Sequence, residues 1–261
     1  MMKRKILYVV PSLLLGGLET FIMNLVKNID MNKYEVHFSL MSINIEDYYK
    51  KEAEQLGAII HKSEKDLYKN KFKRLKMYYK HIFDLVKKYN FDVVHVNSST
   101  SLAYRACKAA KKAGCKCVIF HSHNTSAGYG KYLNLLFKGK ARKWSDYHFA
   151  CGKDAGVWLF GKKFLTSNKS RVINNGFDLS KYKFDLNVRN EYRSNLNIKD
   201  DTKVFIMVSS LSPAKNHLFM IDVFNKYVET NPNSLLLIAG DGPLKIEIEN
   251  KIRIFACFVI I

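Results

Sequence analysis

The chain has 261 residues and a formal net charge of +20, because 43 lysines and arginines face 23 aspartates and glutamates. A composition that is 48% hydrophobic and 13% aromatic excludes a disordered chain, and the length is enough for one full domain and part of another. The five cysteines are odd in number and include no CxxC pair. We therefore expect free thiols in a reducing compartment rather than disulfides or a metal site.

The N-terminal segment looks at first like a secretion signal, because Lys3-Arg4-Lys5 precede an apolar run over residues 6–15. The run lacks a small-residue cleavage site and is interrupted by Pro11, so a buried first strand of a parallel sheet explains it better. No apolar stretch approaches the ~18 residues that are needed to span a bilayer. We therefore expect a cytoplasmic protein.

Apolar runs alternate with amphipathic stretches along residues 1–174, which is typical of an α/β fold. The predicted strands are Lys5–Pro11, Tyr34–Leu40, Asp92–Val96, Cys117–Phe120, Tyr147–Ala150 and Val172–Asn174. Helical periodicity appears at Leu18–Asn28, Glu46–Leu56, Phe72–Tyr89, Ser101–Ala113, Tyr132–Lys143 and Lys153–Phe160. Six strands joined by helices predict a Rossmann-like N-terminal domain with right-handed crossovers.

The positive charge of this first domain is unevenly placed. Residues 93–145 contain ten lysines and arginines but no aspartate or glutamate, and a second basic block covers residues 62–88. Such a field attracts nucleic acid, anionic lipid or phosphorylated substrates, unless it is only a solvated surface. No nucleic-acid-binding signature is present, so we expect no nucleic-acid partner. Residues 131–143 mix apolar and basic side chains as interfacial helices do, which predicts a peripheral position on the inner face of the plasma membrane.

Residues 175–201 are polar and charged without a long apolar run, so they are predicted to be a linker. An incomplete second domain is expected over residues 202–261, with the predicted strands and helices Val204–Ser209, Asn216–Glu229, Ser234–Ala239 and Leu244–Lys251. The apolar tail Ile254–Ile261 breaks this pattern. We consider two explanations: a reading frame truncated or shifted near Arg253, or a tail that adds a strand to the exposed edge of the second sheet.

Gly16 and Gly17 separate the first predicted strand from the first helix. Glycines here let the backbone approach a ligand closely, and a helix N-terminus favours phosphate. A purely structural turn explains the pair equally well. The motif is not GxGxxG, and no acidic residue ends the second strand to hold a ribose, which counts against an NAD-dependent enzyme.

Three histidines lie where predicted strands end. His95 ends the third strand, and His121 and His123 flank the end of the fourth. The carboxyl ends of parallel strands line the ligand crevice, so we expect the three to converge there. Any one of them could instead be a structural histidine. Metal binding is disfavoured, because no carboxylate accompanies them between residues 93 and 145.

Five loop motifs follow one another in a fixed order between residues 5 and 252. They are Gly16-Gly17-Leu18-Glu19, His121-Ser122-His123-Asn124, Asn175-Gly176-Phe177-Asp178, Ser212-Pro213-Ala214-Lys215-Asn216 and Ala239-Gly240-Asp241-Gly242-Pro243. Together they resemble the family 4 (group 1) glycosyltransferases, which are retaining enzymes with two Rossmann-like domains (the GT-B fold). The resemblance implies an α/β chain with one complete Rossmann-like domain and the beginning of a second, of the capsular or exopolysaccharide biosynthesis type.

The resemblance also implies the substrates and the roles of particular residues. The donor is expected to be a nucleotide-sugar, with UDP as the nucleotide, and the acceptor lipid-linked or a saccharide; neither a cofactor nor a metal is expected. Catalytic positions, which orient and stabilise the reacting sugar, are His121 and, as second choice, His123. The implied donor-binding residues are Gly16, Gly17, Ser210, Lys215 and Asn216, the last also as a helix cap, and the acceptor-side residues are Glu19, His95 and Asn124.

The second domain departs from the family pattern in two places. Where the family has Gly-Arg, this chain has Ser209 and Ser210, and a serine cannot bind a diphosphate bidentately as an arginine does. The family's later pair of glutamates, eight positions apart, has no counterpart, because Glu247 and Glu249 lie too early and too close together. The alternatives to an active transferase are therefore an inactive truncated remnant, or a module that binds anionic lipid or a partner transferase.

Overall fold

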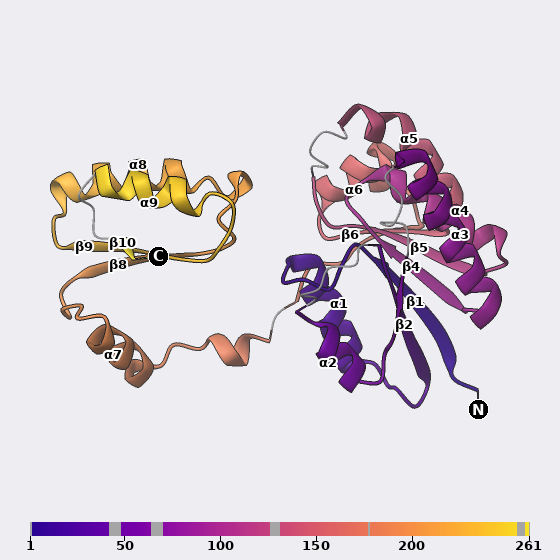
Figure 1. The fold of residues 1–261 in the computed structure, drawn as a ribbon, viewed down its shortest axis with the longest axis horizontal. Helices are drawn as coiled ribbons and strands as arrows, with labels where there is room; N and C mark the ends of the chain where they lie inside the picture. Colours follow the sequence, from indigo (N-terminus) through magenta and orange to yellow (C-terminus); the bar gives the residue numbers. More distant parts are fainter. Residues whose placement is uncertain are drawn as a thin grey trace. The chain divides into compact units, whose positions relative to one another are not determined.

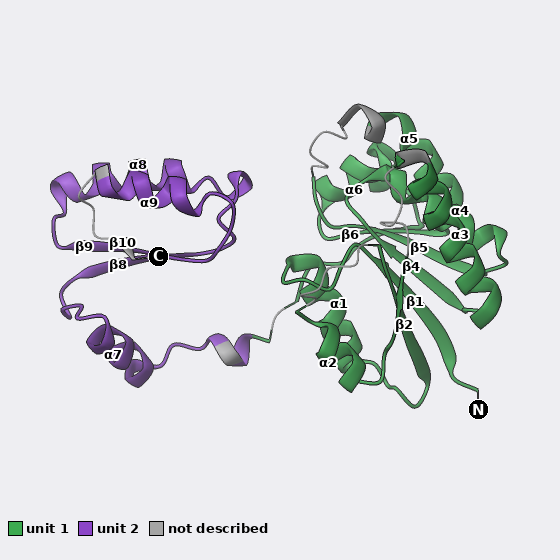
Figure 2. Ribbon diagram, viewed as in Figure 1, with its two compact units in different colours: residues 1–178 green, residues 179–261 purple. Residues whose placement is uncertain are grey.

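The computed structural model describes residues 2–41, 48–63, 70–125, 131–176, 178–254 and 259–260. The chain forms two compact units, unit 1 over Met1–Asp178 and unit 2 over Leu179–Ile261 (Figure 2). Both are α/β units built on parallel sheets, which confirms the predicted fold class. Phe177 of the third loop motif, residues 255–258 and 261 of the tail, and the start of the helix predicted at 46–56 lie outside the described residues.

The sheet of unit 1 has seven parallel strands in the order β3-β2-β1-β4-β5-β6-β7. The strands are β1 (Arg4–Val10), β2 (Tyr34–Leu40), β3 (Ile59–Lys62), β4 (Val93–Asn97), β5 (Cys117–Ser122), β6 (Tyr147–Ala150) and β7 (Ser170–Val172). The sequence predicted six of them and missed β3, a four-residue edge strand that is only partly buried. It also predicted the last strand at Val172–Asn174, which is shifted by two residues toward the C-terminus relative to β7.

Helices cover both faces of this sheet (Figure 1). On one face lie α1 (Gly17–Asn28) and α2 (Lys50–Gln55). The other face carries α3 (Lys71–Tyr89), α4 (Tyr104–Lys112), α5 (Lys131–Trp144) and α6 (Lys153–Phe160), with the short 3-10 helices η2 (Ser101–Ala103) and η4 (Lys162–Leu165). Two hydrophobic cores result, one on each side of the strands.

Strand β1 shows why the sheet can be buried on both sides. Successive side chains of a strand point to opposite faces, so an uninterrupted apolar run supplies both cores. Tyr8 and Val10 pack in the core beneath α1 and α2, whereas Leu7 and Val9 pack in the core beneath α3 to α6. The continuous apolar run of this segment, which first suggests a secretion signal, is thus an interior strand of the unit 1 sheet, between β2 and β4.

The chain order reverses direction at the centre of the sheet. From β1 the chain moves outward to β2 and β3, then returns to β4 on the other side of β1 and continues to β7. In open parallel sheets, ligands bind at the carboxyl edge beside such a switch point. The loop after β1, which ends at Gly16 just before Gly17 begins α1, lies there, and so does the end of β4, which holds His95.

Unit 2 has a three-stranded parallel sheet in the order β10-β9-β8, formed by β8 (Lys203–Val208), β9 (Ser234–Ala239) and β10 (Val259–Ile260). Helices α8 (His217–Thr230) and α9 (Lys245–Ile254) lie together on one face, as Figure 1 shows. Side chains on the other face of β8 are open, with Ile206 and Val208 65% and 74% exposed. The 3-10 helix η6 (Pro213–Lys215) precedes α8.

Two observations bear on the connecting segment and the tail. The stretch predicted as a linker contains the 3-10 helix η5 (Leu179–Tyr182) and the helix α7 (Leu186–Asn195), so it is not without structure. Asp185 caps α7 by accepting hydrogen bonds from the backbone N–H groups of Asn187 (2.8 Å) and Val188 (3.2 Å). In the tail, residues 259–260 form β10 on the edge of β9, which agrees with the second explanation considered above.

Candidate functional site

Three histidines converge at the carboxyl edge of strands β4 and β5. His121 lies in β5 beside His95 of the neighbouring strand, and His123 follows directly after the end of β5. The Nε2 atom of His95 lies 3.3 Å from Nδ1 of His121, and these two rings are parallel. The ring centroids of His121 and His123 are 4.0 Å apart. The convergence expected from sequence is present, although the roles of the histidines stay predictions.

Asn97, which the sequence analysis did not single out, joins this cluster. Its side-chain amide donates to the backbone carbonyl of His95 (3.0 Å), and its Oδ1 lies 2.9 Å from Nε2 of His123. Asn97 is fully buried at the end of β4, two positions after His95 and hence on the same side of the strand. The signal that could have found it is this two-residue spacing at the carboxyl end of a strand.

His95 and His121 are buried and His123 is half-buried, and the three imidazoles are neutral at pH 7. Burial lowers the pKa of His95 to about 3, with the nearby His123 as a smaller cause, and burial lowers the pKa of His123 to about 4. The pKa of His121 is also lowered, by burial first and then by its two histidine neighbours. Nε2 of His121 and Nδ1 of His123 are buried and have no hydrogen-bond partner among the described residues. Two nitrogens are therefore left for a ligand to engage.

Helix α1 closes one side of the cluster. Phe21 in its first turns is buried against the rings of His121 and His123, with centroid distances of 5.0 and 5.5 Å. At the N-terminus of the helix, a Cβ atom on Gly16 would lie 2.5 Å from Oε2 of Glu19, so the carboxylate occupies the space that a side chain would need. A Cβ atom on Gly17 would lie 3.5 Å from the side-chain amide of Asn175.

The third loop motif therefore lies along α1 within unit 1. The amide of Asn175 lies close to Gly17, and the side chain of Asn24 donates to the carbonyl of Gly176 (2.8 Å). Asn124, predicted on the acceptor side, is exposed, and its Oδ1 accepts from the backbone N–H of Thr125 (2.8 Å). Ser122 between the two histidines donates to the carbonyl of Ala155 (2.8 Å), which anchors the end of β5 to α6.

In unit 2, two loops at the carboxyl edge of the sheet are tied together. The backbone of Leu211 donates to Asp241 (2.9 Å) and accepts from Leu244 (3.0 Å). Gly240 fits only without a side chain, because its Cβ would lie 1.9 Å from the carbonyl oxygen of Ser209. Gly242 has φ +154°, a conformation that favours glycine.

The predicted donor residues lie on the first of these loops. Ser210 is exposed, with its hydroxyl 3.3 Å from that of Ser212, and Lys215 is exposed at the end of η6. Asn216 occupies the N-cap position of α8, as predicted, with φ +53°, but its side chain makes no capping hydrogen bond. Its left-handed backbone turns the chain into the helix, a conformation that asparagine tolerates better than most residues.

His217 is a second residue that sequence reasoning missed. It is fully buried in the first turn of α8, and its Nε2 lies 3.1 Å from the hydroxyl of Ser209. The contact joins the loop after β8 to the start of the helix. The position of His217 directly after Lys215-Asn216 does not predict a partner for its ring. The contact with Ser209 is therefore visible only in the structure.

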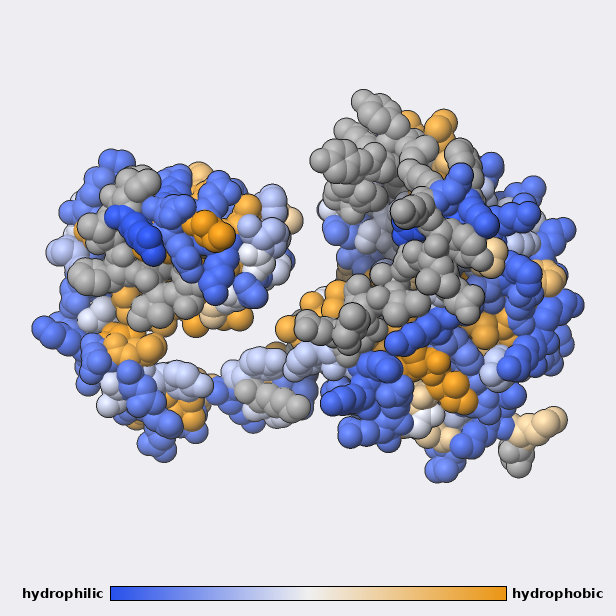
Figure 3. All heavy atoms as spheres, in the orientation of Figure 1, coloured by the Kyte–Doolittle hydropathy of each residue, from blue (hydrophilic) through white to orange (hydrophobic). Residues whose placement is uncertain are grey.

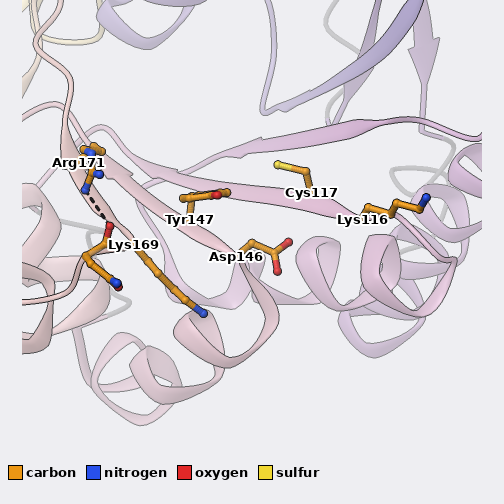
Figure 4. Close-up of a pocket in the computed structure, with 7 residues that line it drawn as sticks. Lys116, Cys117, Asp146, Tyr147, Lys169 and Arg171 are labelled. Atoms are coloured by element: carbon orange, nitrogen blue, oxygen red, sulfur yellow. Dashed lines mark hydrogen bonds between the residues drawn. The ribbon is translucent and has the colours of Figure 1, made fainter.

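A pocket of about 650 Å³ lies at the opposite, amino edge of the unit 1 sheet (Figure 4). It is lined by residues at and before the starts of β5, β6 and β7: Lys116, Cys117, Asp146, Tyr147, Asn168, Lys169 and Arg171. Asp146 is engaged by Lys111 (2.6 Å) and by the backbone N–H of Val118 (2.7 Å). This pocket is separate from the histidine cluster, since the two lie at opposite ends of the same strands.

Among the described residues, no group of three or more His, Cys, Asp or Glu side chains is placed to hold a metal ion. The histidines of the cluster instead bond or stack with one another. Within the described ranges, no helix has the length and apolar character needed to cross a bilayer.

The chain consists of two α/β units built on parallel sheets, and comparison with known proteins identifies the family. The model of Glycosyltransferase Family 4 matches residues 15–181, and that of Glycosyl transferases group 1 matches residues 188–254. The first match covers more than half of the chain. The chain therefore belongs to glycosyltransferase family 4.

Individual relatives agree with this assignment. EpsF of Bacillus subtilis (strain 168), named as a glycosyltransferase, is 27% identical over 96% of this chain and 65% of its own length. An Escherichia coli enzyme, UDP-Gal:alpha-D-GlcNAc-diphosphoundecaprenol alpha-1,3-galactosyltransferase, is 30% identical over 62% of this chain and 44% of its own length. The chain thus spans less than two thirds of the length of either relative.

A solved structure shows the same fold. The crystal structure of Anabaena Alr3699/HepE in complex with UDP superposes with a TM-score of 0.72 at 17% identity, covering 98% of this chain and 66% of that one. At this identity the likeness establishes the fold alone, which is the GT-B fold of two Rossmann-like domains.

Proposed function

We propose that this chain is a retaining glycosyltransferase that moves a sugar from a UDP-sugar to a lipid-linked or saccharide acceptor in polysaccharide biosynthesis. Family membership supports a transferase. The substrate classes are supported by two relatives: the name of one specifies UDP-Gal and a diphosphoundecaprenol acceptor, and the structure of another contains UDP.

The observation that carries the proposal is the neutral histidine cluster at the switch point of unit 1. His121 is fully buried, is oriented by His95 at 3.3 Å, and keeps Nε2 without a partner among the described residues. A fixed, neutral imidazole can hydrogen-bond a sugar without the reorganisation that a mobile side chain would need. His121 therefore positions the reacting sugar and stabilises the charge that develops during transfer, with His123 beside it.

Unit 2 is proposed to bind the diphosphate of the donor. The first backbone N–H groups of an α-helix have no partner within the helix and favour an anion, and Lys215 adds a positive charge two residues before the start of α8. Ser210 would add one neutral hydrogen bond where the family pattern has a bidentate arginine, so we expect weak nucleotide binding.

A thermal-shift titration of the full chain with UDP and several UDP-sugars tests this proposal. A ligand that binds only the folded state raises the melting temperature by an amount that grows with its concentration. A saturable shift is expected with UDP-sugars, and release of UDP upon addition of a polyprenyl-diphosphate sugar would then show transfer. A cooperative melt that millimolar ligand does not move would favour an inactive remnant instead.

We further propose that unit 1 binds anionic membrane through α5. Leu135 and Leu136 are 67% and 72% exposed on this helix, and Lys138 and Lys140 lie near the aromatic rings of Trp158 and Phe137. Figure 3 shows hydrophilic residues over much of the visible face of this unit, with apolar patches between them. Exposed leucines flanked by lysines are typical of helices that lie in the headgroup region. A membrane position would bring the enzyme to a lipid-linked acceptor.

A further inference from the structure

We propose that Asn97 is a positioning residue that holds His123 in the tautomer protonated on Nε2, so that Nδ1 of His123 accepts a hydrogen bond from a substrate hydroxyl. The identity of that hydroxyl, as one of a sugar, rests on the proposed function. The tautomer itself does not, because it follows from contacts within unit 1.

The orientation of the Asn97 amide is fixed by its surroundings. The group that faces the carbonyl oxygen of His95 at 3.0 Å has to be the donor, because a carbonyl oxygen only accepts hydrogen bonds. The NH₂ group therefore points to His95. Rotating the amide by 180° would set two oxygens against each other and would leave the amide N–H groups facing His123. Asn97 is fully buried, so solvent cannot compensate for that exchange.

The tautomer of His123 follows from this orientation. Oδ1 of Asn97 lies 2.9 Å from Nε2 of His123 and can only accept, so Nε2 carries the hydrogen. A neutral imidazole has one ring hydrogen, which leaves Nδ1 with a free lone pair. His123 is neutral at pH 7, because burial lowers its pKa to about 4. The second nitrogen of the ring is therefore an acceptor.

That acceptor is available for a ligand. Nδ1 of His123 is buried and has no hydrogen-bond partner among the described residues, and a buried polar atom without a partner is costly. The neighbouring rings of His121 and Phe21, with centroids 4.0 and 5.5 Å from that of His123, hold the imidazole in place. An uncharged acceptor shielded from water favours an uncharged donor, and a hydroxyl is the donor group that every sugar offers.

Nitrogen-15 NMR of the full chain tests the tautomer directly, because protonated and bare ring nitrogens differ widely in chemical shift. We expect His123, assigned through a His123→Gln variant, to show a protonated Nε2 and a bare Nδ1 at pH 7. A protonated Nδ1 would overturn the proposal. The measurement needs no substrate, so a failure of the proposed transferase function would leave its outcome unchanged.

Two substitutions of Asn97 test whether this residue sets the tautomer. Asn97→Leu removes the acceptor, and we expect signals from both tautomers and a loss of about 10- to 100-fold in kcat/KM for transfer. Asn97→Asp retains an oxygen toward His123: a buried carboxyl group is protonated and can still donate to the His95 carbonyl. We expect it to keep the Nε2–H tautomer and most of the activity. A folded Asn97→Leu protein with an unchanged tautomer would refute the role of Asn97, and UDP-sugar binding without any transfer would count against the proposed function only.

Discussion

At the level of single residues, burial determines what the histidine cluster can do. A charged imidazole would be disfavoured in this environment, so His95, His121 and His123 act as neutral hydrogen-bonding groups. Which hydrogen bonds they can make depends on how their rings are oriented, and neighbouring side chains fix that orientation. The outer nitrogens of His121 and His123 are the atoms that remain for substrate.

Replacing His121 by alanine should lower kcat for sugar transfer by about 10²- to 10³-fold, because a preoriented hydrogen-bonding group is lost from the reaction centre. Steady-state release of UDP measures the effect. His148→Leu is the matched control, since His148 is also a buried histidine of the same sheet, on β6, but packs on Phe160 instead of the cluster. Equal losses in the two variants would contradict a catalytic position for His121.

The histidines of the cluster also make the stability of unit 1 dependent on pH. An unfolded chain titrates its histidines near pH 6.5, whereas the pKa values of His95 and His123 in the folded unit are about 3 and about 4. Between pH 6.5 and 4 the unfolded state therefore binds more protons. The free energy of unfolding should fall as the pH is lowered through this window, by up to ~1.4 kcal/mol per pH unit for each responding histidine.

Guanidinium titrations at pH 7 and pH 4.5 measure this effect by tryptophan fluorescence, which reports on unit 1 because Trp144 and Trp158 are the two tryptophans of the chain. A double variant His95→Asn/His123→Asn should show a shallower dependence on pH. An unfolding free energy that stays constant in the wild-type protein over this range would show that the two histidines are not neutral in the folded state.

Ser210 is the residue at which a gain of function can be predicted. Ser210→Arg should lower the Kd for UDP by about 10- to 100-fold, since hydrogen bonds to a charged group contribute about 1.5–3 kcal/mol and a guanidinium can bind phosphate bidentately. Isothermal titration measures the affinity. Ser194→Arg on the exposed helix α7 adds the same charge elsewhere in unit 2 and should leave the affinity unchanged. Similar affinities of all three proteins would place the diphosphate away from this loop.

At the level of elements, two helical glycines should respond in opposite directions to the same substitution. A Cβ on Gly156 of α6 would lie 2.2 Å from the buried ring of Phe164, so Gly156→Ala should destabilise unit 1 by about 1–3 kcal/mol. A Cβ on Gly139 of α5 would have no atom within 4 Å, so Gly139→Ala should stabilise unit 1 by about 0.5–1 kcal/mol. Guanidinium unfolding measures both, and a stabilising Gly156→Ala would mean that α6 packs differently.

The sequence predicted the elements whose signal is local and strong. Buried strands such as β1 and β4 are continuous apolar runs, and six of the seven strands of unit 1 were found from this pattern. Strand β3 was missed because four half-exposed residues resemble a loop. Helix α7 was missed because none of its residues is buried, so it has no apolar stripe, and its start depends on the cap that Asp185 provides.

For the candidate site, the sequence predicted only which residues lie together at the carboxyl ends of neighbouring strands. The convergence of His95, His121 and His123 followed from their positions at neighbouring carboxyl ends. The two-residue spacing from His95 could have placed Asn97 in the cluster, but its hydrogen bonds could not be inferred, because they depend on the orientation of the amide and on a 2.9 Å contact with His123. Likewise, an asparagine before a helix suggests a side-chain cap, whereas Asn216 contributes a left-handed backbone.

At the level of the whole molecule, the net charge of +20 gives a general attraction to anionic surfaces, but its distribution should decide what the protein binds. If α5 is the membrane contact, its lysines should matter more than lysines elsewhere. Lys138→Glu/Lys140→Glu should weaken binding to phosphatidylglycerol vesicles by about 30-fold or more, since each basic residue near the surface contributes about 1 kcal/mol. Vesicle sedimentation at 50 mM and 300 mM salt measures it, and binding by the wild-type protein should fall as salt rises.

The matched control is Lys226→Glu/Lys245→Glu, which changes the net charge of the molecule by the same amount but lies on α8 and α9 of unit 2. A loss confined to the α5 variant would localise the contact to that helix, where exposed Leu135 and Leu136 can enter the headgroup region. Equal losses would mean that binding follows net charge alone. In that case the apolar residues of α5 would add nothing, and a Leu135→Ser/Leu136→Ser variant would bind as well as the wild-type protein.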